Sequence, residues 1–142
     1  MNYSTSLYTI ENNIKTICIA ADSVPEGIHD AHEKLHAFFP DKTGRKFYGI
    51  AHGNVQGGIV YYAATNEIFE GEAQSLNFPS FSIKKGDYNT ILIKDYYKDI
   101  PSVGRAFDFL LKDARLEPDG YCLEMYPTPH NSKDIICCVK IL

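Results

Sequence analysis

Two segments of helical periodicity divide this 142-residue chain, and each is preceded by one strand-like stretch and followed by two. The first helix is predicted between Gly27 and Pro40, because Ile28, Ala31, Leu35 and Phe38 form one apolar stripe and Pro40 disfavours a further turn. The second is predicted over Ser102–Ala114, with Ser102 as its N-terminal cap. This repeated order restricts the chain to a small number of folds.

The strand-like stretches are short apolar runs bounded by turn residues. We predict them at Leu7–Ala20, Phe47–His52, Ile59–Ala64, Phe81–Ile93, Tyr121–Tyr126 and Ile135–Leu142. The first is interpreted as a bent strand or a strand pair, and Gly86-Asp87 interrupts the fourth as a bulge or kink. We therefore expect an α+β fold in a single domain, residues 1–142. It would be a tandem β-α-β-β duplication, with both helices on one face of a curved antiparallel sheet and a ligand groove between the halves on the other.

Charge and composition exclude several classes of function. The net charge is −4, and the densest basic segment, Lys42–Lys46, holds three cations beside Asp41, so we expect no nucleic-acid partner. No apolar run approaches 18 residues, and residues 1–6 lack the regions of a signal peptide. The four cysteines form no CxxC pair and are expected to be buried free thiols. A cytoplasmic location and no membrane contact are expected.

Three short motifs occur in order along the chain. Lys46-Phe47-Tyr48-Gly49-Ile50 joins an aromatic residue, a glycine and an aliphatic residue, Lys85-Gly86-Asp87-Tyr88 contains Gly-x-Tyr, and Tyr121–Tyr126 contains Glu-x-Tyr. Together they resemble the strands of the GyrI-like, AraC-type effector-binding domain family, here without a DNA-binding half. The resemblance implies a duplicated sheet-and-helix fold that binds small, often cationic or aromatic, molecules in a central groove.

The resemblance also implies a site residue, Glu124, with Tyr126 beside it on the same strand. A carboxylate among apolar and aromatic neighbours is costly to ionise, and a cationic ligand would supply the missing charge. The ring of Tyr126 could add a cation–π contact. Tyr48 and Tyr62 are further candidates for the pocket wall. The alternative is that Glu124 lies at the rim and faces solvent.

A separate motif, His32-Glu33-Lys34-Leu35-His36, matches the HExxH pattern of zinc hydrolases. On a helix it places His32 and His36 one turn apart, and His29 extends the same side. The sequence offers no clear third ligand, so the alternative is a polar, exposed helix face. We expect no metal or other cofactor.

The leading hypothesis is a stand-alone binding protein for a hydrophobic, cationic or aromatic compound, rather than an enzyme. A second hypothesis is a hydrolase of reactive electrophiles, with Glu124 as general base and Tyr126 as proton donor. A zinc-dependent hydrolase acting through His32 and His36 is a lesser alternative. An interaction protein is a third class, and the sequence identifies no protein partner for it.

Overall fold

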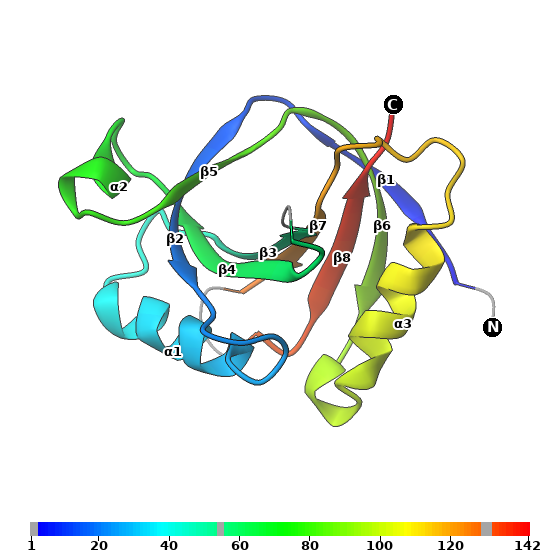
Figure 1. Ribbon diagram of the computed structural model, residues 1–142, viewed down its shortest axis with the longest axis horizontal. Coiled ribbons are helices and arrows are strands. Elements are labelled where there is room, and N and C mark those ends of the chain that lie inside the picture. Colours follow the sequence, from blue (N-terminus) through cyan, green and yellow to red (C-terminus); the bar gives the residue numbers. More distant parts are fainter. Residues whose placement is uncertain (1–2, 54–55, 129–131) are drawn as a thin grey trace.

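The computed structural model describes residues 3–53, 56–128 and 132–142 (Figure 1). Along the chain the elements are β1 (Ser6–Ile10), β2 (Ile14–Ala20), α1 (Ile28–Phe38), β3 (Phe47–Gly53), β4 (Ile59–Asn66), α2 (Glu72–Ser75), β5 (Ser80–Ile83), β6 (Gly86–Ile93), a 3-10 turn (Tyr96–Lys98), α3 (Pro101–Leu110), β7 (Cys122–Tyr126) and β8 (Ile135–Lys140).

The strands form one antiparallel sheet in the order β1-β6-β8-β7-β3-β4-β2-β5. The units β2-α1-β3-β4 and β6-α3-β7-β8 occupy mirrored positions in this order, and they meet where β3 pairs with β7. The predicted α+β duplication with a curved sheet is therefore confirmed (Figure 1). The strand that precedes each unit pairs with the other unit, since β1 lies beside β6 and β5 beside β2.

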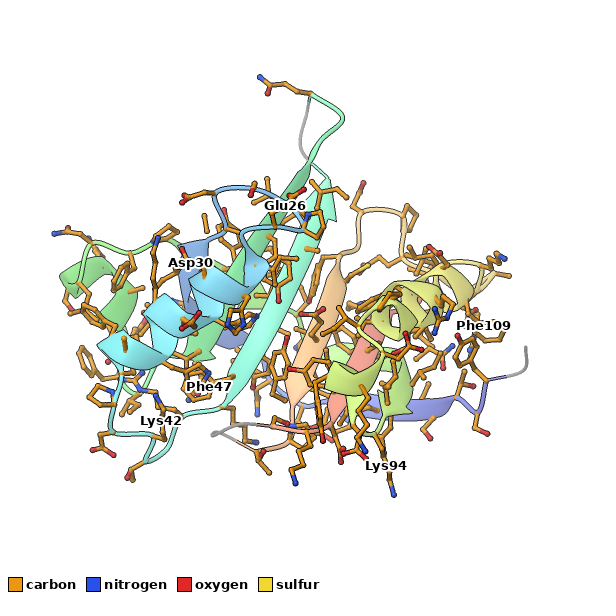
Figure 2. All side chains as sticks on the ribbon, turned by 90° about the horizontal axis from the view of Figure 1, so that it is seen from below. Glu26, Asp30, Lys42, Phe47, Lys94 and Phe109 are labelled. Atoms are coloured by element: carbon orange, nitrogen blue, oxygen red, sulfur yellow. The ribbon has the colours of Figure 1, made fainter. Side chains whose placement is uncertain are left out.

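Both long helices lie on one face of the sheet, as predicted. α1 packs on β2 and β4, and α3 packs on β6 and β8. Each has its own core, centred on Leu35 under α1 and Leu110 under α3, both fully buried. In Figure 2 the two helices lie on the near side of the sheet, with β3 and β7 running between them. Side chains of β3, β4 and β7 that point to this face therefore lie between the helices.

The opposite, helix-free face has a core of its own. Tyr48, Ile50, Tyr88 and Leu123 are buried there. Because successive side chains of a strand point to opposite faces, this assignment fixes which residues of β3 and β7 face the helices.

The structure differs from the sequence-based expectations in three places. The predicted Phe81–Ile93 strand is two strands, β5 and β6, and the second begins at Gly86, whose φ of 136° favours glycine. The predicted Ser102 cap and the predicted end at Ala114 are wrong: α3 spans Pro101–Leu110 after Ile100, and no side chain caps it. The short α2 was not predicted, and the buried Arg45–Glu72 ion pair anchors its first residue.

All four cysteines are free thiols, with Cys18, Cys137 and Cys138 buried and Cys122 half-buried. In the described part of the chain, no helix is long and apolar enough to cross a membrane.

Candidate functional site

Glu124 lies near the middle of β7 and points to the helix face of the sheet, between α1 and α3. Two phenols donate hydrogen bonds to the same carboxylate oxygen, Oε1: Tyr61 Oη at 2.5 Å and Tyr126 Oη at 3.0 Å. Tyr61 comes from β4, so the carboxylate is held by residues from both halves of the duplication. Within the described residues, Oε2 receives neither of these bonds and remains the oxygen open to a further partner.

Gly49 makes this contact possible. It lies directly opposite Glu124 in the β3–β7 pairing and is itself buried. A Cβ atom at position 49 would overlap both Glu124 Oε1 and the Tyr61 hydroxyl. The absence of a side chain therefore creates the space in which the carboxylate and the phenol meet.

His32 completes the cluster from above, on the inner face of α1. Its Nε2 atom lies 2.7 Å from Tyr61 Oη and 3.5 Å from Tyr126 Oη. Because Tyr61 donates its proton to Glu124, its oxygen accepts the bond from His32, which fixes the imidazole as the tautomer with a proton on Nε2. Burial lowers the pKa of His32 to about 4, with smaller contributions from His36 and His29. His32 is therefore neutral at pH 7.

The electrostatics of the cluster are those of a carboxylate with no counter-ion. Burial raises the pKa of Glu124, and the hydrogen bonds from Tyr61 and Tyr126 offset part of that rise. The pKa values of Tyr61 and Tyr126 are themselves well above 10, because of burial first and then the nearby Glu124. Among the described residues no cationic side chain forms an ion pair with Glu124.

Further aromatic surface extends toward α3. The ring of Tyr96, in the 3-10 turn before α3, lies 6.2 Å from the ring of Tyr126. Burial raises the pKa of Tyr96, and Glu124 raises it further, as it does for Cys122 on β7 and Cys137 on β8. The carboxylate is thus surrounded by phenols, thiols and a neutral imidazole.

The structure brings together two of the four residues predicted for the ligand site. Glu124 and Tyr126 share the helix face, and Glu124 is half-buried rather than a solvent-facing rim residue. Tyr48 and Tyr62 point to the helix-free face, where Tyr48 is only 4% exposed. The groove that we expected on that face therefore does not contain Glu124.

Sequence reasoning missed Tyr61 and His32 as partners of Glu124. The prediction for β4 named Tyr62, the neighbour of Tyr61, as the pocket residue. His32 was considered only as a zinc ligand. Its position on the stripe that also contains Ala31 and Leu35 was a usable signal, because a helix presents that side to the sheet.

The three histidines of α1 have three different environments. His29 is 87% exposed at its side chain and pairs with Glu33 at 2.8 Å. His36 stacks on Phe47, with ring centroids 4.2 Å apart, and only His32 reaches Tyr61. The alternative of an exposed polar helix face thus describes His29 and not His32. Across residues 3–53, 56–128 and 132–142, no group of three or more His, Cys, Asp or Glu side chains is arranged to hold a metal ion.

No protein-family model matches the sequence, and no curated protein matches it either. Solved structures do match. An integron cassette protein from the mobile metagenome of Vibrio cholerae has a TM-score of 0.67 at 12% identity, over 97% of this chain and 95% of its own. SAV2435, in a structure bound to tetraphenylphosphonium, has a TM-score of 0.65 at 8% identity, over 100% of this chain and 94% of its own.

The third similar structure is the EcmrR C-terminal domain, with a TM-score of 0.57 at 12% identity, over 99% of this chain and 97% of its own. At these identities the likeness establishes the architecture alone. The chain shares its fold with SAV2435 and with the EcmrR C-terminal domain.

Proposed function

We propose that the chain binds a small organic cation at Glu124, on the helix face of the sheet, and that binding rather than turnover is its function. The observation that carries this proposal is the carboxylate itself. It is held by two neutral phenols and, among the described residues, has no cationic partner. An ionised carboxylate away from water is costly unless it is paired, and a bound cation would supply that pairing.

The residues around Glu124 suit an organic cation better than a hydrated metal ion. The aromatic rings of Tyr61, Tyr126 and Tyr96 lie around Glu124, and the face of such a ring attracts an alkylated or arylated cation. The one nitrogen base in the cluster, His32, is neutral and uses its Nε2 proton toward Tyr61. Tetraphenylphosphonium, the compound in the SAV2435 structure, belongs to this chemical class.

His32 covers the proposed site from the helix side. It reaches the cluster from α1, whereas Glu124, Tyr61 and Tyr126 all lie on the sheet. A cationic ligand that displaces the imidazole would break one neutral hydrogen bond and form an ion pair with Glu124. The cation would then lie between Glu124 and α1.

The test is calorimetric titration with tetraphenylphosphonium, benzyltrimethylammonium and the neutral triphenylphosphine oxide. We expect saturable binding of at least one cation and none of the neutral compound. Glu124→Gln should weaken that binding at least tenfold, because the attraction between the cation and the ionised carboxylate disappears. Glu33→Gln is the matched control, since Glu33 lies on the exposed side of α1 and should leave affinity unchanged. Equal affinity of the wild type and Glu124→Gln for every cation would contradict the proposal.

Hydrolysis of an electrophile at the same site is a second candidate, favoured by one observation. The raised pKa of Glu124 brings the carboxyl closer to the working range of a general base, and Tyr126 bonds the same oxygen. Incubation with an epoxide or activated ester, followed by product analysis, separates the two functions. Turnover that is lost in Glu124→Gln would establish the enzyme, and an unconsumed compound would leave binding as the function.

A further inference from the structure

A second concavity lies on the other side of the sheet. Its volume is about 330 Å³, within the range of small-molecule sites. The lining residues come from the end of β3, from β5 and from the loop before β7: His52, Gly53, Phe81, Asp119, Gly120 and Tyr121. Phe81 and Tyr121 pack on the helix-free core, and His52 is three residues from Gly49 along β3, which places it on the opposite face from Glu124.

One wall of this concavity is a connected set of aromatic rings. The rings of His52 and Phe81 are nearly parallel, 18° apart in orientation with centroids 5.9 Å apart. Tyr121 packs edge-on against Phe81 at 5.0 Å. The Tyr121 hydroxyl is engaged by the backbone N–H of Lys84 and by Tyr88 Oη, so the phenol is fixed in place. The wall is therefore rigid and mostly apolar, and it offers a flat surface for stacking.

The remaining lining residues supply charge and space. Gly53 and Gly120 contribute only backbone, and Asp119 contributes an exposed carboxylate. Within the described ranges Asp119 forms no hydrogen bond or ion pair through its side chain, unlike Glu117 nearby, which pairs with Lys140 at 3.3 Å. The carboxylate of Asp119 is the only formal charge among the lining side chains when His52 is neutral, and the whole chain carries a net charge of −4.

We infer that this concavity is a second ligand site, separate from Glu124, for a flat aromatic cation such as an arylamidinium or a protonated arylamine. The ring of the ligand stacks on the His52–Phe81 wall, and its cationic group faces Asp119. Tyr62, whose ring is 6.0 Å from that of His52, lies behind the wall. The inference does not depend on the function proposed for Glu124, because the two sites share no residue and lie on opposite faces.

The test uses benzamidine and the neutral, nearly isosteric benzamide as probes on the full chain. Both are titrated into the Glu124→Gln variant, so that the carboxylate on the helix face cannot bind the cation. Backbone amide chemical shifts report the location, and the signals of Gly53 and Gly120 serve as markers for the second site. We expect benzamidine to shift these signals saturably and benzamide to bind more weakly.

Asp119→Asn in the same background should weaken benzamidine binding about twofold to fivefold, the range for a partly exposed ion pair, and leave benzamide binding unchanged. Phe81→Leu should weaken both probes, because it removes the stacking surface and keeps an apolar side chain. Shifts that are non-saturable, or that are equal in Asp119→Asn, would overturn the inference. So would shifts confined to residues around position 124. Failure of benzamidine here leaves the tetraphenylphosphonium result at Glu124 unaffected, so the two proposals fail separately.

Discussion

Gly49 and Glu124 lie directly opposite each other across the β3–β7 pair, and the carboxylate of one occupies the space that a side chain on the other would fill. This pair is also where the two halves of the duplication join. The candidate site therefore lies at the strand pair that joins the two halves. Its geometry depends on Gly49, which has no side chain to contribute.

Replacing Gly49 by alanine should separate Glu124 from Tyr61. The new methyl group overlaps both side-chain oxygens, so one or both must move, and we expect a loss of about 1–3 kcal/mol in the free energy of unfolding. Urea denaturation measures it. Gly104→Ala is the control, because that position in α3 has nothing within 4 Å of an added Cβ. There we expect a gain of about 0.5–1 kcal/mol, from the greater helix propensity of alanine. Equal effects at the two positions would contradict this account.

Replacing Tyr61 by phenylalanine should destabilise the protein and leave its shape intact. The hydroxyl both donates to Glu124 and accepts from His32, so two partners lose a hydrogen bond. We expect a loss of about 1–3 kcal/mol, measured by thermal or urea unfolding. Tyr62→Phe is the matched control on the opposite face of the same strand, and it should change stability by less than about 0.5 kcal/mol. A Tyr62 variant that is as destabilised as the Tyr61 variant would argue against the cluster.

His32 should make stability depend on pH between about 4 and 6.5. The pKa of His32 is about 4 in the folded protein, against 6.5 for an ordinary histidine, so in this interval the unfolded chain binds more protons. Stability contributed by neutral His32 is complete above pH 6.5 and is lost as the pH falls toward 4. The loss is at most about 3 kcal/mol.

The measurement compares urea unfolding of His32→Gln and the parent across that pH interval. Both should carry Glu124→Gln, because the pKa of Glu124 is also shifted by the fold and its titration would add a second pH dependence. The parent should lose stability on acidification more steeply than His32→Gln. Parallel pH profiles for the two proteins would show that His32 is not held neutral by the fold.

Glu124 should act in the opposite direction. Its pKa in the folded protein is raised above the ordinary value of 4.5, so the folded state binds more protons than the unfolded chain above that pH. Stability is therefore lost as the pH rises through the folded pKa of Glu124. Without ligand, the stability of Glu124→Gln relative to the wild type should therefore increase as the pH rises above 4.5. A saturating organic cation should reverse that trend, and thermal unfolding with and without tetraphenylphosphonium tests both expectations.

Much of the fold could be predicted because its elements have clear local signals. The first helix was predicted because Ile28, Ala31, Leu35 and Phe38 form an apolar stripe and Pro40 ends it, and the structure has a helix over Ile28–Phe38. The split between β5 and β6 was less clear, because Gly86 is compatible with a bulge as well as with a break. The four-residue α2 is too short to show a period, and it depends on a long-range ion pair.

The site was only partly predictable, and the choice between Tyr61 and Tyr62 shows why. The segment from Val60 to Ala64 is apolar throughout, so alternation cannot tell which residues face the helices. The pairing of β4 with both β2 and β3 decides it, and that pairing is long-range. The contact of His32 with Tyr61 likewise depends on where α1 lies over the sheet, which no local pattern specifies.

The exchange of β1 and β5 between the two halves has a mechanical consequence. β1, which precedes the first unit, forms the edge strand beside β6 of the second unit, and β5 forms the edge strand beside β2 of the first. The arrangement is that of a domain swap within one polypeptide. If either half unfolds, the other half loses the pairing of its edge strand. The unfolding of one half is therefore coupled to that of the other. The β3–β7 pair that contains Glu124 should unfold together with both halves, in a single cooperative transition.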